Sequence, residues 1–103
     1  MAPPKLTPEQ RAAALQKAAE ARRARAELKE LLKMGSLSLS DVFERSDSDD
    51  IIAGTKVASV LQSVPGLGKI KAKRLMEELS IADNRRLRGL GTRQRQALLD
   101  RFS

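Results

Sequence analysis

The tripeptide Gly-Leu-Gly occurs twice, in VPGLGKI at residues 64–70 and in LRGLGTR at residues 87–93, and uses four of the six glycines. In such a turn the first glycine allows backbone angles closed to other residues, and the middle leucine anchors the loop inward. The second glycine lets another backbone come close and opens a helix. Aligning residues 64–80 with residues 87–103 pairs Gly66, Leu67, Gly68 and Leu75 with Gly89, Leu90, Gly91 and Leu98. We therefore expect the same turn-and-helix unit twice.

The remaining pattern is helical and predicts no strand. Thr7 can cap a first helix that has Pro8 at its first position and Gln10 completing a capping box. Gly35 ends this helix after about Lys33. Two further helices are expected at about residues 39–45 and from Gly54 or Thr55 to Val64. Another helix begins at Gly68, with Ile70, Leu75, Met76 and Leu79 on its apolar side. The last helix runs from about Thr92 to Phe102, with Leu98, Leu99 and Phe102 facing inward.

These helices predict an all-α fold of five or six helices. A long N-terminal helix over residues 1–36 would join a compact helical body over residues 37–103, in one domain overall. Residues 46–50, SDSDD, are expected to form an acidic loop that supplies helix caps. A calcium loop begun at Asp47 is excluded because Ile52 and Ala58 stand where glycine and glutamate are needed.

The composition removes several function classes. The chain has 103 residues and neither cysteine nor histidine, so thiolate zinc sites, disulfides and most nucleophilic triads are unavailable. We expect no enzyme, no metal and no cofactor. No apolar run approaches the roughly 20 residues that span a bilayer, and the N-terminus lacks a hydrophobic signal region. A cytoplasmic protein without a membrane partner is expected.

Charge is segregated along the chain, whose formal net charge is +7. Residues 1–36 carry eight Lys/Arg and four Glu, residues 37–55 one Arg and five acids, and residues 56–103 eleven Lys/Arg and four acids. Such asymmetry indicates a polyanionic partner such as nucleic acid. On the first helix, one stripe gathers Arg11, Arg22, Arg25, Lys29 and Lys33. This stripe is either a solvated face or a second contact patch.

Both turns can bind phosphate. The first N–H groups of a helix lack partners, and the helix dipole adds positive potential, so a phosphate oxygen satisfies both. Lys69, Lys71 and Lys73 follow the first turn; Arg85, Arg86 and Arg88 precede the second, and Arg93 and Arg95 follow it. Such contacts read little sequence. With no Trp or Tyr to stack on single strands, duplex DNA bound by its backbone and shape is the expected partner. Two patches would allow bending or bridging.

Three blocks, LTPEQRAAALQKAAEARRARAELK, KVASVLQSVPGLGKIKAKRLMEEL and RRLRGLGTRQRQALLDRF, closely resemble the actinobacterial integration host factors. The resemblance implies a monomeric, nucleoid-associated, helix-two-turns-helix protein. It would bind and bend duplex DNA with low sequence specificity and affect chromosome organisation, supercoiling and recombination, with phage integrase or topoisomerase as further partners. The family's contacts map onto Pro65, Gly66, Leu67, Gly68, Lys69, Lys71, Arg85, Arg86 and Arg88. Secondary contacts are expected at Arg22, Arg25, Lys29, Lys33, Lys56 and Arg93.

Three other functions are compatible with the sequence. A helix-two-turns-helix also occurs in a ribosomal small-subunit family, which would make the chain an RNA-binding protein; a final helix ending at Phe102 fits that role less well than a basic tail would. Amides that hold DNA phosphates could instead hold a small nucleotide such as a cyclic dinucleotide. A metal-dependent hydrolase would have to use Asp47, Asp49 and Asp50, but the loop that carries them is expected to be mobile.

Overall fold

The computed structural model describes residues 5–102. In its first three helices, a polar side chain caps the N-terminus. Thr7 and Gln10 form the expected reciprocal capping box at the start of α1 (Pro8–Lys33). Ser38 and Asp41 form a second box at the start of α2 (Leu39–Ser48), and Asp49 caps α3 (Asp50–Ala53). Gly35, at φ 75°, lies just after the end of α1. The predicted bounds of the first helix are confirmed.

The acidic stretch 46–50 is not the loop that the sequence predicted. The expected end at Arg45 is wrong, because α2 continues through Ser48 and α3 starts at Asp50. Asp49 alone breaks the helix, and its Oδ1 accepts hydrogen bonds from the N–H groups of Ile51 (2.9 Å) and Ile52 (3.4 Å). The expectation that this stretch supplies a helix cap is confirmed.

The second half of the chain forms α4 (Val57–Ser63), α5 (Lys69–Glu78), a short 3-10 helix η1 (Leu87–Gly89) and α6 (Thr92–Phe102). The residues from 5 to 102 form no strand, and the all-α prediction is confirmed. Val64, before Pro65, is extended at φ −69° and ψ 129°, as predicted for a helix end at a proline. However, α4 begins at Val57 rather than at Gly54 or Thr55, because Thr55 and Val57 pair with the backbone of Leu87 and Arg85.

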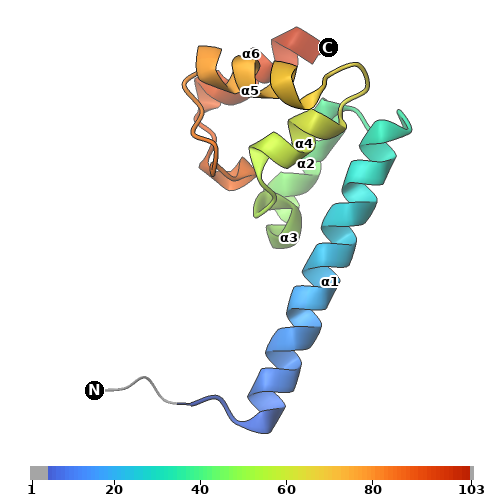
Figure 1. Ribbon diagram of the computed structural model, residues 1–103, viewed down its shortest axis with the longest axis vertical. Helices are drawn as coiled ribbons and strands as arrows, with labels where there is room; N and C mark the ends of the chain where they lie inside the picture. Colours follow the sequence, from blue (N-terminus) through green and yellow to red (C-terminus); the bar gives the residue numbers. More distant parts are fainter. Residues whose placement is uncertain (1–4, 103) are drawn as a thin grey trace.

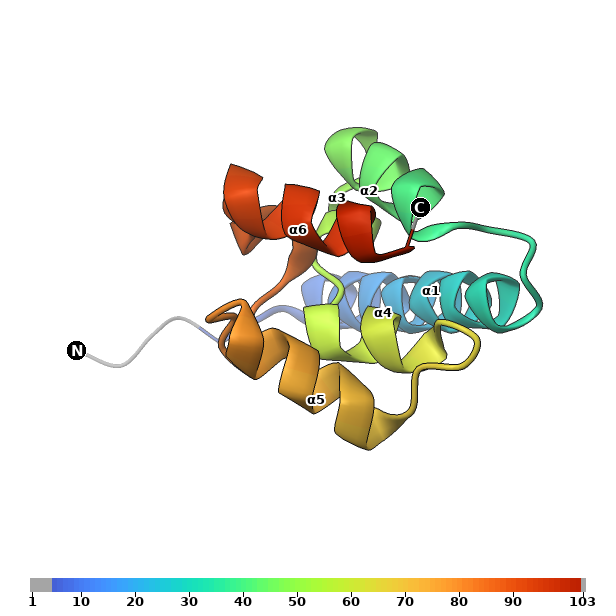
Figure 2. The same cartoon turned by 90° about the horizontal axis from the view of Figure 1, so that it is seen from above.

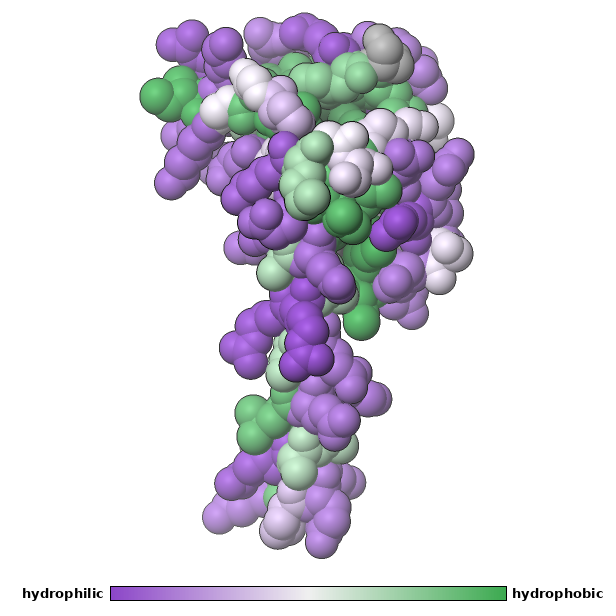
Figure 3. Space-filling view, turned by 90° about the vertical axis from the view of Figure 1, so that its right-hand side faces the viewer, coloured by the Kyte–Doolittle hydropathy of each residue, from purple (hydrophilic) through white to green (hydrophobic). Residues whose placement is uncertain are grey.

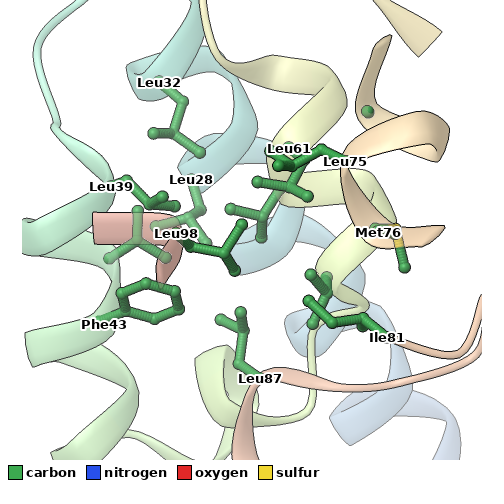
Figure 4. Close-up of a cluster of buried hydrophobic side chains, with 14 of the residues drawn as sticks. Leu28, Leu32, Leu39, Phe43, Leu61, Leu75, Met76, Ile81, Leu87 and Leu98 are labelled. Atoms are coloured by element: carbon green, nitrogen blue, oxygen red, sulfur yellow. The ribbon is translucent and has the colours of Figure 1, made fainter. Parts of the chain in front are cut away.

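The helices pack around one aliphatic core with a single phenylalanine (Figure 4). Leu28 and Leu32 of α1 are at most 2% exposed, and Phe43, Leu61 and Leu98 come from α2, α4 and α6. Leu99 and Phe102 are partly buried against the core. Seen from above, α4 lies between α1 and α5, with α2 and α6 on the other side of the body (Figure 2). The C-terminal part of α1 therefore belongs to the core.

The N-terminal part of α1 projects away from the body (Figure 1). Its surface is mainly hydrophilic (Figure 3), and Leu15 is 63% exposed. High alanine content keeps this part helical without tertiary contacts. Within residues 5–102, no helix combines the length and hydropathy that a membrane span requires.

One prediction about α5 is wrong. Ile70, which the sequence placed on the apolar side with Leu75 and Met76, is 72% exposed. At about 100° per residue, Ile70 lies roughly 140–200° around the helix from Ala72 and Leu75. Ala72 is instead 1% exposed, and α5 packs against α4. Ala72, Leu75 and Met76 therefore form the buried side of α5, and Ile70 faces outward.

Candidate nucleic-acid interface

The first Gly-Leu-Gly turn forms a tight loop between α4 and α5. Gly66 adopts φ 82°, a left-handed conformation that favours glycine. Leu67 is half-buried against the core, and its N–H donates to the Val64 carbonyl at 3.0 Å. Gly68 caps α5 with an ordinary φ of −79°, and a Cβ built there would meet nothing within 4 Å. The expected close approach of another backbone at Gly68 is therefore absent within the described chain, and the turn is open to the outside.

The start of α5 carries backbone N–H groups without partners. The first internal hydrogen bond of α5 runs from the Ala72 N–H to the Gly68 carbonyl, at 2.9 Å. Unlike α1, α2 and α3, this helix has no side-chain cap. The N–H groups of Lys69, Ile70 and Lys71 thus lack acceptors in the part of the chain that the structure describes. A ten-residue helix with open N–H groups and two flanking lysines is suited to an anion.

The second Gly-Leu-Gly turn is built differently, so the prediction of one unit used twice is only half right. Gly89 ends η1 and has no left-handed φ. The Gly91 carbonyl accepts from the Arg95 N–H at 2.9 Å, just as Gly68 does for Ala72. However, the Gly91 N–H is already bonded to the Gln94 side-chain oxygen, at 3.0 Å. An internal acceptor therefore occupies the N–H of the residue that precedes α6, whereas the Gly68 N–H makes no such bond within residues 5–102.

The connector before this turn carries three arginines and lies along the N-terminal end of α4. The Val57 N–H donates to the Arg85 carbonyl at 2.9 Å, and the Leu87 N–H donates to the Thr55 carbonyl at 3.0 Å. This antiparallel bridge places Lys56 opposite Arg86. Two cations 30 residues apart in sequence thus become neighbours. The Arg85 side chain turns back on the connector and donates to the Gly89 carbonyl at 2.8 Å.

Guanidinium groups from α1 and from the connector converge on Gly54, at the end of α3. Arg25 Nε donates to the Ile51 carbonyl at 3.2 Å, and Arg86 Nη1 donates to the Gly54 carbonyl. A Cβ at Gly54 would lie 2.8 Å from Arg25 Nη2 and 3.4 Å from Arg88 Nη2. The carbonyls of Ile51 and Gly54 hold the Arg25 and Arg86 guanidinium groups in place, and the N–H groups that make no bond there can bind an anion.

Three adjoining hollows join the cations into one continuous face. The first, about 230 Å³ in volume, lies between α1 and the start of α4 and is lined by Arg25, Lys29, Thr55, Lys56, Ser59 and Arg86. The second, about 190 Å³, shares Lys29 and Ser59 with it and adds Lys33, Gln62 and Ser63. The third, about 230 Å³, shares Gln62 and continues to α5 with Ala58, Lys69, Lys73, Met76 and Asp83. The helices α1 and α5 thus lie on either side of α4, and the same row of hollows is lined by Arg25, Lys29 and Lys33 of α1 and by Lys69 and Lys73 of α5.

Ion pairing leaves this face positively charged. Residues 5–102 form two ion pairs, Arg95–Asp47 and Arg101–Glu78, both at 2.8 Å. The cations around the hollows therefore have no carboxylate partner within those residues. Arg95, which the sequence placed after the second turn, instead donates two hydrogen bonds to Asp47 and lies 5.0 Å from the centre of the Phe43 ring. It belongs to the contact between α2 and α6.

The structure brings most of the predicted site residues together. Lys69 and Lys71 lie at the first turn; Arg25, Lys29, Lys33, Lys56 and Arg86 line the hollows. Arg22 and Arg93 are exposed but line none of the three. Gly54, Ser59 and Gln62 were not anticipated. The spacing of Lys56, Ser59 and Gln62 on one helix face was an available signal, but the position of α1 beside that face was not.

Chemically, the face offers cations, hydroxyls, an amide and open backbone N–H groups, which together suit a chain of phosphates. No group of three or more carboxylates that could bind a metal occurs in the described part of the chain. The face consists of three adjoining hollows that are open to solvent, rather than of one enclosed cavity.

The chain is similar to known proteins over nearly its whole length. Residues 32–102 match the S13-like H2TH domain family. The integration host factor of Mycobacterium tuberculosis is 57% identical over 102 residues, which cover 99% of this chain and 97% of that protein. The integration host factors of Mycolicibacterium smegmatis and Streptomyces coelicolor are 56% and 52% identical over 99% of this chain and 97% and 95% of their own.

A solved structure, that of sIHF bound to an 8-bp palindromic DNA, matches with a TM-score of 0.82 and 45% sequence identity, over 85% of this chain and 99% of that one. The identities and coverage are high enough to decide the relationship over nearly the whole length. The chain therefore belongs to the family of the mycobacterial and Streptomyces integration host factors.

Proposed function

We propose that this protein binds duplex DNA through its phosphate backbone, with low sequence specificity, and bends it as an architectural protein of the nucleoid. The observation that carries the proposal is the continuous face of cations across α1, α4 and α5. None of these cations forms an ion pair within residues 5–102, although Asp83 also lines the hollow beside α5. The structural neighbour bound to DNA supports the same partner. The S13-like domain alone would also fit RNA, but the full-length relatives favour DNA.

The face has the form needed to follow a phosphate backbone. Lys69, Lys71 and the open N–H groups of α5 would hold phosphates at one end. The guanidinium groups around Gly54 would hold phosphates at the other end, between α1 and α4. A duplex that touches both ends must follow the face, and such a constraint favours bent DNA. Effects on chromosome organisation, supercoiling and recombination would follow from bending, without catalysis by this chain.

The same proposal extends to two enzymes that act on DNA and to one small ligand. Phage integrase or topoisomerase would act on the DNA that this protein bends rather than on a preformed protein pocket. A cyclic dinucleotide could compete for the cations of the hollow between α1 and α4, which includes Arg25 and Arg86. Neither is required for the binding of DNA itself.

The proposal is tested by the salt dependence of DNA affinity in single alanine variants of Arg86 and Arg88. Each cation that contacts a phosphate adds up to about one unit to the slope of log K against log salt. We expect each variant to bind more weakly and to flatten the slope on duplexes of unrelated sequence. Arg101→Ala is the matched control, because it removes the same charge from a residue paired with Glu78. Slopes equal to that of the control in both variants would refute the role of this region.

A further inference from the structure

Ile70 is a large apolar residue whose side chain is exposed on the outward face of α5. It is 72% exposed, more than the other exposed large hydrophobic residues Leu6, Leu15 and Met34. Its helix buries Ala72, Leu75 and Met76 on the opposite side. Most of the Ile70 side chain therefore lies outside the packing of α5. An isoleucine is also costly to keep in water at this position, which directs attention to what would cover it.

The surroundings of Ile70 select the kind of partner. It stands in the first turn of α5, between Lys69 and Lys71, and its own N–H is one of the open N–H groups of that turn. Under the proposed function these groups hold DNA phosphates, so whatever covers Ile70 lies beside bound phosphates. The apolar surfaces of duplex DNA next to phosphates are the deoxyribose rings and the stacked bases, which the narrow minor groove presents together.

We propose that Ile70 enters the minor groove beside the phosphates held by Lys69 and Lys71, packs against the deoxyribose rings and opens one base step. This inference rests on the proposed function and adds the residue that produces the bend. Its β-branch leaves χ1 few states, so the side chain acts as a stiff wedge with little entropy to lose. Apolar wedges in the minor groove unstack a base step and kink the duplex. Flexible pyrimidine–purine steps are the preferred place of insertion.

The test uses the full chain with Ile70→Ala, Ile70→Thr and two reference variants. Leu15→Ala removes an equally apolar and 63% exposed side chain from the projecting part of α1. Lys69→Ala removes a proposed phosphate contact. Bending is measured by energy transfer across an end-labelled duplex of about 25 base pairs, with a central TA step or an A-tract. Affinity is measured across a salt series, and stability by thermal unfolding.

We expect both Ile70 variants to fold normally and to keep the wild-type salt slope, because no phosphate contact is lost. Their affinity should fall roughly five- to tenfold, with a smaller bend and a weaker preference for the TA duplex. Leu15→Ala should behave as wild type. Lys69→Ala should bind more weakly with a flatter slope. This combination separates an apolar contact with the groove from a phosphate contact.

Wild-type affinity and bend in Ile70→Ala, together with weak binding by Lys69→Ala, would overturn the wedge and leave the proposed function standing. Wild-type behaviour in Lys69→Ala, Arg86→Ala and Arg88→Ala would overturn the proposed function itself. If Ile70→Ala alters only the self-association of the free protein in sedimentation, a second copy of the chain covers the side chain, and the proposal of a wedge in DNA is wrong.

Discussion

Two glycines of the first turn, Gly66 and Gly68, have different physical roles. Gly66 adopts φ 82°, where a Cβ is strained whatever the space around it. Gly68 has φ −79° and open space at its Cβ position. We expect Gly66→Ala to lower the free energy of unfolding by about 1–2 kcal/mol. Gly68→Ala should change it by less than about 0.5 kcal/mol. Urea unfolding of the two variants checks this, and equal losses would contradict it.

The Asp47–Arg95 pair gives stability a pH dependence. Hydrogen bonds from the Arg95 guanidinium lower the pKa of Asp47 below its ordinary value of 3.8. Because the folded-state pKa is the lower one, the stabilisation is present above pH 3.8 and is lost as the pH falls through the folded-state pKa. Hydrogen bonds from the Ser38 N–H and hydroxyl likewise lower the pKa of Asp41.

We therefore expect the free energy of unfolding to fall as the pH is lowered from 6 towards 3, and Asp47→Asn to fall less steeply. Urea unfolding at several pH values measures both slopes. Asp41→Asn is the matched comparison, because it removes the other carboxyl whose pKa is lowered and leaves the Arg95–Asp47 ion pair intact. If the Asp47→Asn curve keeps the full wild-type pH dependence, the ion pair does not stabilise the folded state.

At the residue scale, the sequence predicted which residue types form the turn better than it predicted where individual side chains point. The turn and the special backbone angles of Gly66 were identified from local spacing alone, but the close approach expected at Gly68 was not found. The placement of Ile70 on the apolar side was wrong, and the helical period alone separates it from Leu75 by roughly 140°. The pairing of Arg95 with Asp47 was missed, because those residues lie 48 positions apart in the chain.

At the element scale, one side chain holds both ends of the arginine connector. Gln94 Nε2 donates to the carbonyls of Leu79 (3.2 Å) and Ser80 (3.1 Å), while its Oε1 accepts from the Gly91 N–H. Ser80 is left-handed, at φ 57°. The amide thus joins the end of α5 to the start of α6 and closes the segment 80–91. Arg85, Arg86 and Arg88 lie within that closed segment.

Gln94→Glu should loosen this closure, because a carboxylate cannot donate and faces two carbonyl oxygens. We expect a loss of about 1–2 kcal/mol in the free energy of unfolding and faster hydrogen exchange at residues 80–91. Gln96→Glu, on the same helix, is the control and should cost no more than about 0.5 kcal/mol. Identical exchange in the two variants would show that Gln94 does not hold the connector.

Element boundaries were predictable where a local signal fixes them. The capping box gave the start of α1, Gly35 its end, and Pro65 the end of α4. The bounds of α2 and α4 were not predictable to the same degree. The extension of α2 to Ser48 and the late start of α4 at Val57 accompany contacts with α6 and with the connector, respectively. Those partners lie far along the chain, and no local pattern names them.

At the scale of the whole molecule, the fold turns separate basic segments into one surface. From the sequence we expected one basic patch on the first helix and another at the turns. The structure places α1 and α5 on either side of α4, and the hollows between them share Lys29, Ser59 and Gln62. The bridge between Lys56 and Arg86 completes the connection. Only tertiary packing could supply this adjacency.

The most direct test of a single DNA-binding face is the salt dependence of affinity in two double variants. Lys29→Ala/Lys33→Ala removes cations from α1, and Lys69→Ala/Lys71→Ala removes cations from α5. If one duplex lies along the whole face, the wild-type slope is steeper than roughly −4, and each double variant flattens it by up to about two units at unchanged one-to-one stoichiometry. A wild-type slope in the α1 double variant, with loss confined to the α5 variant, would contradict a continuous face.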